Sequence, residues 1–458
     1  MRKTKLAFMP VSSTQHIDGK DGNGNPSIDR EMIDKSYNFL IEEGYDVIYK
    51  KEAGIIDTCE KAWDLIKYFK IEEVDCIIFY FAGWFWVTHY MQPVRWANIP
   101  IIGWSPNISR GWGFNDIGVM NGAMKEWGNL SYKPVWGQPG EHFVKDRIKF
   151  FSDGAKVKNI LQKSKFGLLG GTSMGIAAGF ADFNEWGDKF GIFTEHTSEL
   201  VIIEEARKIA DEVVFDFYKT LKKEFGYVVD FNEQTGRSIR HYLAYKKIIQ
   251  ENEYNFTALK CTFDASNYYV SACLSQALLA MDGFVSTCEG DCYAALTERV
   301  FQTITDQVIF AADVQRVDAG NNIIFLVDDG TANPNMACDR SCVELKNQWT
   351  GEAKTGGICL KLNAKPGKVT LARISREGKN GHVCQLATGE VFNETQMDHD
   401  SFCGCGFPDW PHAYVKLDGD INKFVENMNV EYIHMVYGDI TDSMIETCNL
   451  LDIKVKTN

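Results

Sequence analysis

The chain has 458 residues, enough for two or three domains, since domains run to roughly 100–200 residues each. Its 45% hydrophobic and 24% charged residues are typical of a globular protein and exclude a disordered or low-complexity chain. The formal net charge of −14 repels polyanions, so we expect neither nucleic acid nor an anionic membrane surface as a partner.

The N-terminal segment opens with basic residues, but Pro10 interrupts its apolar run before it reaches the length of a signal peptide. No window holds the roughly 18 apolar residues of a membrane-spanning helix. The 13 cysteines, an odd number, favour reduced thiols, so we expect a cytoplasmic protein. A four-sulfur zinc site is an alternative for Cys338, Cys342, Cys403 and Cys405, although their spacing lacks the usual CxxC pair.

Residues 1–165 alternate short apolar runs with helical stretches. The pattern predicts strands at 5–11, 46–50, 76–81 and 99–104, and helices at 28–43, 58–70 and 141–163. Alternation of strand and helix indicates a parallel sheet with helices on both faces. We therefore expect an N-terminal, doubly wound, Rossmann-like domain.

Residues 166–330 repeat the α/β pattern. Strands are predicted at 166–169, 256–263 and 284–288, and helices at 204–225, 233–251 and 268–281. Beyond residue 330 the chain changes to short strands separated by Gly, Asn and Asp, with a helix at 442–451 before the last strand. The expected fold is α/β: two Rossmann-like parallel-sheet domains, then a smaller, mainly antiparallel, β-barrel-like domain at 331–458.

The segment 284–313 carries the most informative acids. We interpret it as strand (284–288), helix (291–304) and strand (308–311). A parallel crossover within one sheet would bring Glu289 and Asp313 together at the carboxyl ends of neighbouring strands. Two such acids share a proton or bind a cation. Either acid alone could simply precede a helix N-terminus, which favours negative charge.

Two motifs resemble the L-fucose isomerase family and, more distantly, the L-arabinose isomerases. The sequence LGGTSMGIAAGFADFNEW at 169–186 is similar to the family's LGGxSMGI segment. Glu289 in CEGD and Asp313 in FAADV, 313 − 289 = 24 positions apart, match the spacing of the family's metal-binding Glu and Asp. The segments IIFLVDDGTANPN and YGDITDSMIETCNLLDIKV also resemble the family.

The resemblance implies a metal-dependent intramolecular oxidoreductase that interconverts an aldose and a ketose through a cis-enediol, usually with Mn²⁺. Such enzymes are homo-oligomers, often hexamers. A hard cation on carboxylate ligands polarises the C1 and C2 oxygens of the sugar, while a carboxylate moves the proton between the two carbons. Glu289 and Asp313 would combine both roles, and the sequence leaves open which of them is the base.

The chain departs from the family at the third metal ligand. A family His lies six positions before the glycine that corresponds to Gly438, and here that position is Tyr432. His434, on the same face of the strand, is the first candidate to replace it, and His412 is the second. Tyr432 and His412 are also candidate substrate-binding residues.

The substrate is open as well. Met9 precedes Pro10 where L-fucose isomerases have a substrate-binding Arg, which weakens L-fucose itself as the substrate. Trp84 stands where the family has a substrate-contacting Trp, and Arg95 and Arg110 could bind an anionic group. A neutral deoxy-hexose or pentose is therefore one hypothesis, and a sulfosugar, converted from sulfoquinovose to sulfofructose, is the alternative.

Two other classes of protein compete with an isomerase. The glycines of GLLGGTSMG suggest phosphate binding, but the segment lacks both the Walker lysine and the GxGxxG spacing. A non-catalytic sugar-binding protein would also have two α/β domains around a cleft. A binder of neutral sugar gains nothing from two buried carboxylates, so the acid pair favours the enzyme.

Overall fold

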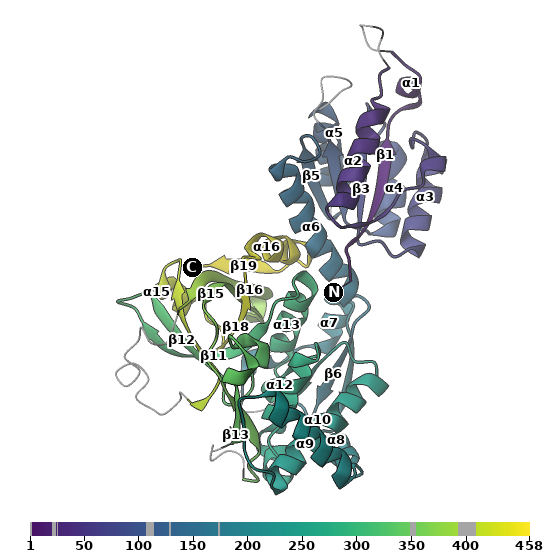
Figure 1. The fold of residues 1–458 in the computed structure, drawn as a ribbon. Helices are drawn as coiled ribbons and strands as arrows, with labels where there is room; N and C mark the ends of the chain where they lie inside the picture. The colour runs from purple at the N-terminus through teal and green to yellow at the C-terminus, as the bar shows by residue number, and fades with distance from the viewer. Residues whose placement is uncertain are drawn as a thin grey trace. The chain divides into compact units, whose positions relative to one another are not determined.

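The computed structural model describes residues 2–20, 24, 26–106, 114–127, 130–172, 175–348, 354–392 and 409–458. The chain forms two compact units, Met1–Ile160 with Asp442–Leu450, and Leu161–Thr441 with Leu451–Asn458 (Figure 1). The domain boundaries predicted after residues 165 and 330 stay predictions. Of the helices within these described ranges, none combines the length and the apolarity needed to cross a membrane.

The first unit is built on a parallel sheet. Its strands, in spatial order, are β2 (Asp46–Ile48), β1 (Lys5–Val11), β3 (Cys76–Phe81), β4 (Ile101–Ser105) and β5 (Tyr132–Trp136). One face packs on α3 (Cys59–Ile71), α4 (Thr88–Ala97) and α5 (Phe114–Trp127). The other face packs on α2 (Arg30–Glu42) and α6 (His142–Leu161). The predicted doubly wound domain is confirmed.

The sequence of β1 explains why both faces of this sheet are covered. Leu6 and Phe8 belong to one core, whereas Ala7 and Met9 belong to the other, because successive side chains of a strand point to opposite faces. An apolar strand without polar alternation is typical of a parallel sheet buried on both sides. The unit also contains α1 (Thr14–Ile17) and α16 (Thr441–Leu450).

The second unit begins with another parallel sheet. Its strands, in spatial order, are β10 (Val285–Thr287), β9 (Phe256–Leu259), β6 (Lys165–Leu169) and β7 (Phe193–Thr197). The helices of this part are α7 (Phe183–Phe190), α8 (Leu200–Ala206), α9 (Asp211–Glu224), α10 (Glu233–Glu251), α11 (Ser266–Tyr268), α12 (Cys273–Met281) and α13 (Cys292–Ile304). The helix predicted at 204–225 is two helices, because Ala210 is extended.

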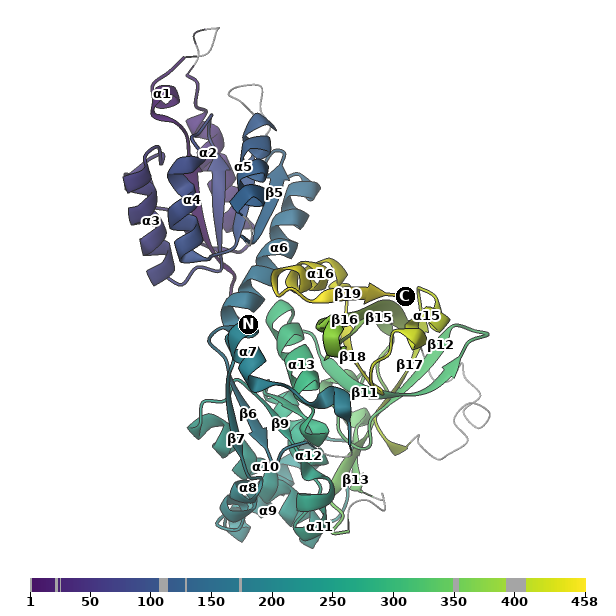
Figure 2. The same cartoon turned by 180° about the vertical axis from the view of Figure 1, so that it is seen from behind.

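A mainly antiparallel sheet completes the second unit (Figure 2). Its strands run in the order β15 (Gly367–Arg376), β18 (Tyr432–Tyr437), β11 (Ile309–Asp318), β12 (Ile323–Val327), β17 (His412–Leu417), β16 (His382–Val391) and β19 (Lys454–Thr457). Since β15 also pairs with β16, the sheet closes on itself as a barrel. A small sheet of β14 (Ile358–Lys361), β13 (Glu344–Asn347) and β8 (Tyr227–Val228), and helix α15 (Ile421–Glu426), lie in the same unit. The expected α/β layout with a barrel-like part is confirmed.

One predicted strand lies in a different sheet from the one expected. The run at 308–311 was predicted to be a parallel neighbour of 284–288, which is wrong: β11 pairs antiparallel with β12 and β18 in the barrel. Helix α13 links the two sheets and has buried residues on all sides, as expected of a helix enclosed between layers. Glu289 and Asp313 therefore come from different sheets of the second unit.

Candidate active site

Glu289 follows β10 in the short 3₁₀ turn Cys288–Gly290. Its φ of 59° lies in the left-handed region, which is uncommon for a residue other than glycine. Gly290 is also left-handed, and a Cβ at this position would lie 1.9 Å from the carbonyl oxygen of Gly171. The turn thus packs against the Gly171–Thr172 segment, and Glu289 is only 8% exposed. Strained backbone of this kind occurs preferentially at functional sites.

Asp313 lies on β11, directly opposite Tyr432 of β18. Side chains opposite each other in an antiparallel pair project from the same face of the sheet, with Cβ atoms roughly 5 Å apart. The hydroxyl of Tyr432 donates a hydrogen bond to the carboxylate of Glu289. Tyr432 therefore neighbours both acids, and the structure brings together Glu289, Asp313 and Tyr432.

Burial and like charge shape the acidity of the pair. Burial, followed by the charge of Asp329, raises the pKa of Glu289 to about 7, while the hydrogen bond from Tyr432 lowers it. Burial, then Asp329 and Glu289, raise the pKa of Asp313 to about 8. Burial and the two acids also hold the pKa of Tyr432 well above its usual range, so it is a neutral hydrogen-bond donor. Carboxyl groups that titrate near neutrality suit proton transfer.

Two acids of this site were missed in the sequence. Asp328 and Asp329 directly follow the buried strand β12, whose Val327 pairs with Asp313. Asp328 is 2% exposed and accepts a hydrogen bond from the Thr331 backbone N–H at 2.8 Å. Burial, then the charge of Asp329, raise its pKa well above the ordinary value. The VDDG sequence looks like an ordinary turn, and only the pairing of β12 with β11 identifies these acids as part of the site.

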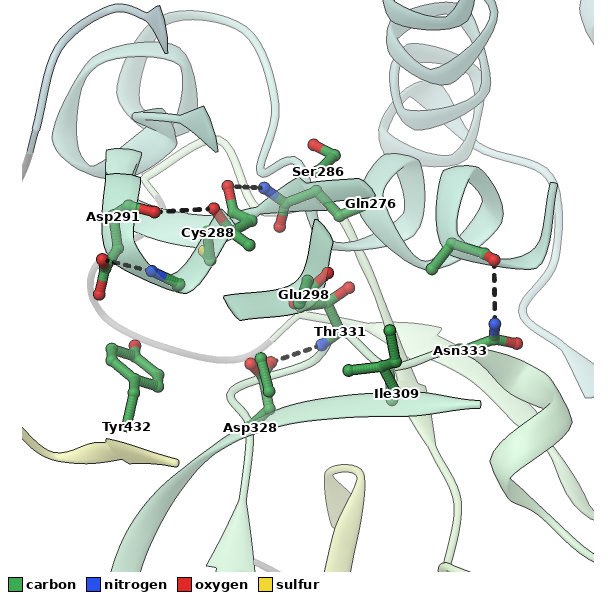
Figure 3. Close-up of a pocket in the computed structure, with 15 residues that line it drawn as sticks. Gln276, Ser286, Cys288, Asp291, Glu298, Ile309, Asp328, Thr331, Asn333 and Tyr432 are labelled. Carbon is green, nitrogen blue, oxygen red and sulfur yellow. Dashed lines mark hydrogen bonds between the residues drawn. The ribbon is translucent and has the colours of Figure 1, made fainter. Parts of the chain in front are cut away.

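A cavity of about 50 Å³ is lined by residues next to the acids in the chain (Figure 3). Its walls include Cys288, which precedes Glu289, and Ala311, which shares a strand face with Asp313. Asp328, Tyr432 and Glu298 also line it, so polar side chains stand among its mainly apolar walls. Because a water molecule needs only about 10–15 Å³, the cavity can hold ordered water.

His434 lies on β18 on the same face as Tyr432, opposite Ala311 and two residue pairs further along β11. Its side chain is fully buried, and its Nε2 is 3.9 Å from Oε1 of Glu298. Burial, and then the charge of Arg373, lower its pKa well below the ordinary value. A neutral imidazole is the form that binds metals, but the contacts of His434 in the described part of the chain point to Glu298 and Arg373.

His412 is 1% exposed on β17, and its Nδ1 lies 2.7 Å from the carbonyl oxygen of Trp410. It pairs with Val327 of β12, two strands from Asp313, which corresponds to roughly 10 Å. His412 lines a separate pocket together with the exposed Cys338 and Cys342. Cys403 and Cys405, the other half of the alternative zinc site, lie outside the described residues.

The described residues contain no group of three or more His, Cys, Asp or Glu side chains arranged to hold a metal ion. The donors at the acid pair are the oxygens of Glu289 and Asp313, with Asp329 adding negative charge to both. Carboxylate oxygens are ligands for hard divalent cations. The chemistry of these two donors thus fits such a cation, with two protein ligands in place of the three expected.

The other predicted substrate residues belong to the first unit. Trp84 is partly buried after β3, its carbonyl oxygen accepts a hydrogen bond from the Ser13 backbone N–H at 2.6 Å, and its ring meets that of Trp86 edge-on. Arg95 is exposed on α4. Arg110 lies outside the described residues. The position of these residues relative to the acids stays a prediction.

Comparisons with known proteins agree with the family resemblance that the sequence motifs indicated. Residues 335–458 match the family model of the L-fucose isomerase C-terminal domain. A curated sulfoquinovose isomerase from Priestia aryabhattai is 20% identical over 100% of this chain and 99% of its own length. A second, from Clostridium sp. (strain MSTE9), is 22% identical over 73% of each chain.

Among solved structures, the periplasmic binding protein component of an arabinose ABC transporter from Shewanella sp. ANA-3 covers 66% of this chain and 84% of its own. Its sequence identity is 13% and its TM-score is 0.18. A superposition this poor supports no inference about fold or function.

Proposed function

Since this chain is an L-fucose isomerase-like aldose–ketose isomerase, we propose that it works with a divalent cation bound by Glu289 and Asp313. The family resemblance and the reaction class predicted from the motifs are confirmed. The non-catalytic sugar-binding alternative is therefore set aside.

The observation that supports the proposal is the meeting of Glu289, Asp313 and Tyr432. Glu289, in the turn after β10, and Asp313, on a barrel strand, both neighbour Tyr432, and each has a pKa near neutrality because of burial and neighbouring carboxylates. Mn²⁺ is the proposed cation, since it accepts oxygen ligands readily. When bound, it would polarise the C1 and C2 oxygens of the sugar.

Glu289 and Asp313 would also move the proton. Conversion of an aldose to a ketose removes a proton from C2 and delivers one to C1, and a general base is most effective when its pKa lies near the working pH. Because Glu289 raises the pKa of Asp313, the two carboxyl groups titrate as a coupled pair. One of the two carboxylates would accept the proton from C2 and return it to C1.

We propose a sulfosugar as the substrate, which was the alternative hypothesis from the sequence. The support is that curated relatives matching the chain are sulfoquinovose isomerases. A sulfonate needs cationic donors, for which Arg95 and Arg110 are the candidates, with Trp84 as a surface for the sugar ring. A neutral deoxy-hexose or pentose is the competing substrate class.

We also propose a homo-oligomer, with a hexamer as the first arrangement to test by light scattering. The family resemblance is the support for this assembly.

The deciding experiment is exchange of the C2 proton in D₂O, followed by NMR. The protein is stripped with a chelator, Mn²⁺ is added back, and L-fucose, D-arabinose, L-arabinose and sulfoquinovose are compared. We expect exchange with sulfoquinovose that requires metal. Exchange with a neutral sugar instead would replace the substrate proposal, and exchange without metal would overturn the proposed role of the cation.

A further inference from the structure

Glu289 and Asp313 lie on separate parts of the second unit, and Tyr432 neighbours both of them. Glu289 ends a strand of the parallel sheet, whereas Asp313 is on a barrel strand. Tyr432 is fixed on the barrel strand β18 opposite Asp313, and its hydroxyl reaches across to the Glu289 carboxylate. From this geometry we infer that Tyr432 is the positioning residue that sets the place of Glu289 relative to Asp313.

The backbone around Glu289 explains why such a residue is needed. Glu289 lies in a left-handed turn rather than in a helix or strand. A carboxylate rotates readily about its last bond, and a hydrogen bond to one oxygen restricts that rotation. Tyr432, by contrast, belongs to a strand whose neighbours on both sides are barrel strands. The strand residue therefore sets the orientation of the turn residue.

The surroundings of Tyr432 agree with this role. Tyr432, Cys288 and Asp328 line the same cavity, so the phenol, the turn that carries Glu289 and the end of β12 border one space (Figure 3). A neutral phenol adds no charge to the acids and leaves Glu289 able to accept a proton or bind a cation. The inference rests on the proposed function, because it takes Glu289 as the group that acts on metal and sugar.

The test compares Tyr432→Phe with a matched control on the same strand. Tyr437 is also buried, and its hydroxyl donates to the Lys365 carbonyl oxygen at 2.8 Å, away from the acids. Tyr432→Phe and Tyr437→Phe each remove one hydroxyl from β18. For the wild type and both variants, Mn²⁺ affinity is measured by calorimetry on stripped protein, and kcat and KM are measured at saturating Mn²⁺.

We expect Tyr432→Phe to weaken Mn²⁺ binding and to lower kcat by about 10–100-fold, as is usual for the loss of a residue that orients a metal ligand. KM for the sugar should change little, since the hydrogen bond acts on the reacting group. Tyr437→Phe should match the wild type in all three quantities. A Tyr432→Phe variant that behaves like Tyr437→Phe would overturn the inference.

The outcomes separate this inference from the proposed function. If wild-type turnover does not depend on Mn²⁺, the role of the cation fails, and a selective loss of kcat in Tyr432→Phe still supports the positioning of Glu289. A loss of melting temperature and activity that is equal in both variants would mean a purely structural role for Tyr432 and would also overturn the inference.

Discussion

Glu289 and Asp291 lie two residues apart in the same turn, yet their surroundings are opposite. Asp291 is 3% exposed, its carboxylate contacts the guanidinium of the buried Arg373 at 2.7 Å, and it caps α13 by accepting the Ala294 backbone N–H. Glu289 is similarly buried, but the charges that act on it most are those of Asp329 and Glu431.

The difference distinguishes structural charge from functional charge. A buried carboxylate with a cationic partner and a helix cap to satisfy stabilises the fold around it. Buried carboxylates that raise one another's pKa cost free energy of folding, and proteins keep such clusters chiefly where they bind a cation or move protons. The same turn thus contributes one acid to stability and one to chemistry.

The strongest test of this comparison removes the charge of the functional acids. We expect Glu289→Gln or Asp313→Asn to lower kcat by about 10²–10⁴-fold, because a general base or metal ligand is lost. The melting temperature should stay the same or rise, since the variant removes a carboxylate whose ionised form is disfavoured by burial and by neighbouring negative charges. Steady-state kinetics with circular dichroism measure both. Full activity in either variant would refute the assignment.

The structural acid should show the reverse pattern. Arg373→Met leaves Asp291 as an unpaired buried charge, which typically costs about 3–5 kcal/mol. We expect the midpoint of urea unfolding to fall accordingly in stripped protein, whereas Mn²⁺ affinity of the remaining folded protein is retained. A stability within error of the wild type would show that the Asp291–Arg373 pair does not support the fold.

The pH dependence of stability gives a smaller effect. The folded pKa of Glu289, about 7, lies above its ordinary value of 4.5, so its contribution is fully present below pH 4.5 and is lost as the pH rises through 7. Asp313 extends the loss to about pH 8. We expect stripped protein to lose unfolding free energy across this window, by up to about 3 kcal/mol for Glu289 alone at about 1.4 kcal/mol per pKa unit, and by more once Asp313 is included.

Added cation should reverse that loss. Mn²⁺ at 100 times its Kd would restore about 2.7 kcal/mol at pH 8, because it binds only the folded state. The Glu289→Gln/Asp313→Asn double variant is the control and should show a shallower profile in urea titrations between pH 5 and 9, since other buried acids such as Glu298 still titrate there. A wild-type profile no steeper than that of the control would contradict the electrostatic interpretation.

The sequence predicted the regular parts of this fold well. The strand at 76–81 coincides with β3 and the helix at 233–251 with α10, since apolar periodicity is a local property. Sheet membership is not local. The apolar run at 308–311 is equally compatible with a parallel or a barrel strand, and only its hydrogen bonds to β12 and β18 decide the matter.

The candidate site shows the same limit. Glu289 and Asp313 could be predicted because motifs and their spacing can be recognised in the linear sequence. Asp328 and Asp329 were missed because their proximity to Asp313 follows from the pairing of β12 with β11. The bridging role of Tyr432 likewise depends on a contact between two sheets, which no spacing in the chain encodes.

His434 gives the smallest expected effect. It was predicted as a metal ligand, yet it lies near Arg373, which belongs to the structural ion pair. Its Nε2 approaches Glu298, and Arg373 is the charge that acts on it. We therefore expect His434→Gln to weaken Mn²⁺ binding by at most about tenfold, equivalent to about 1.4 kcal/mol. Calorimetry on stripped protein measures this against Glu289→Gln, for which binding should be lost. A loss as large as that of Glu289→Gln would make His434 the third metal ligand, and His434 would then belong with the functional residues of β18 rather than with the structural ones.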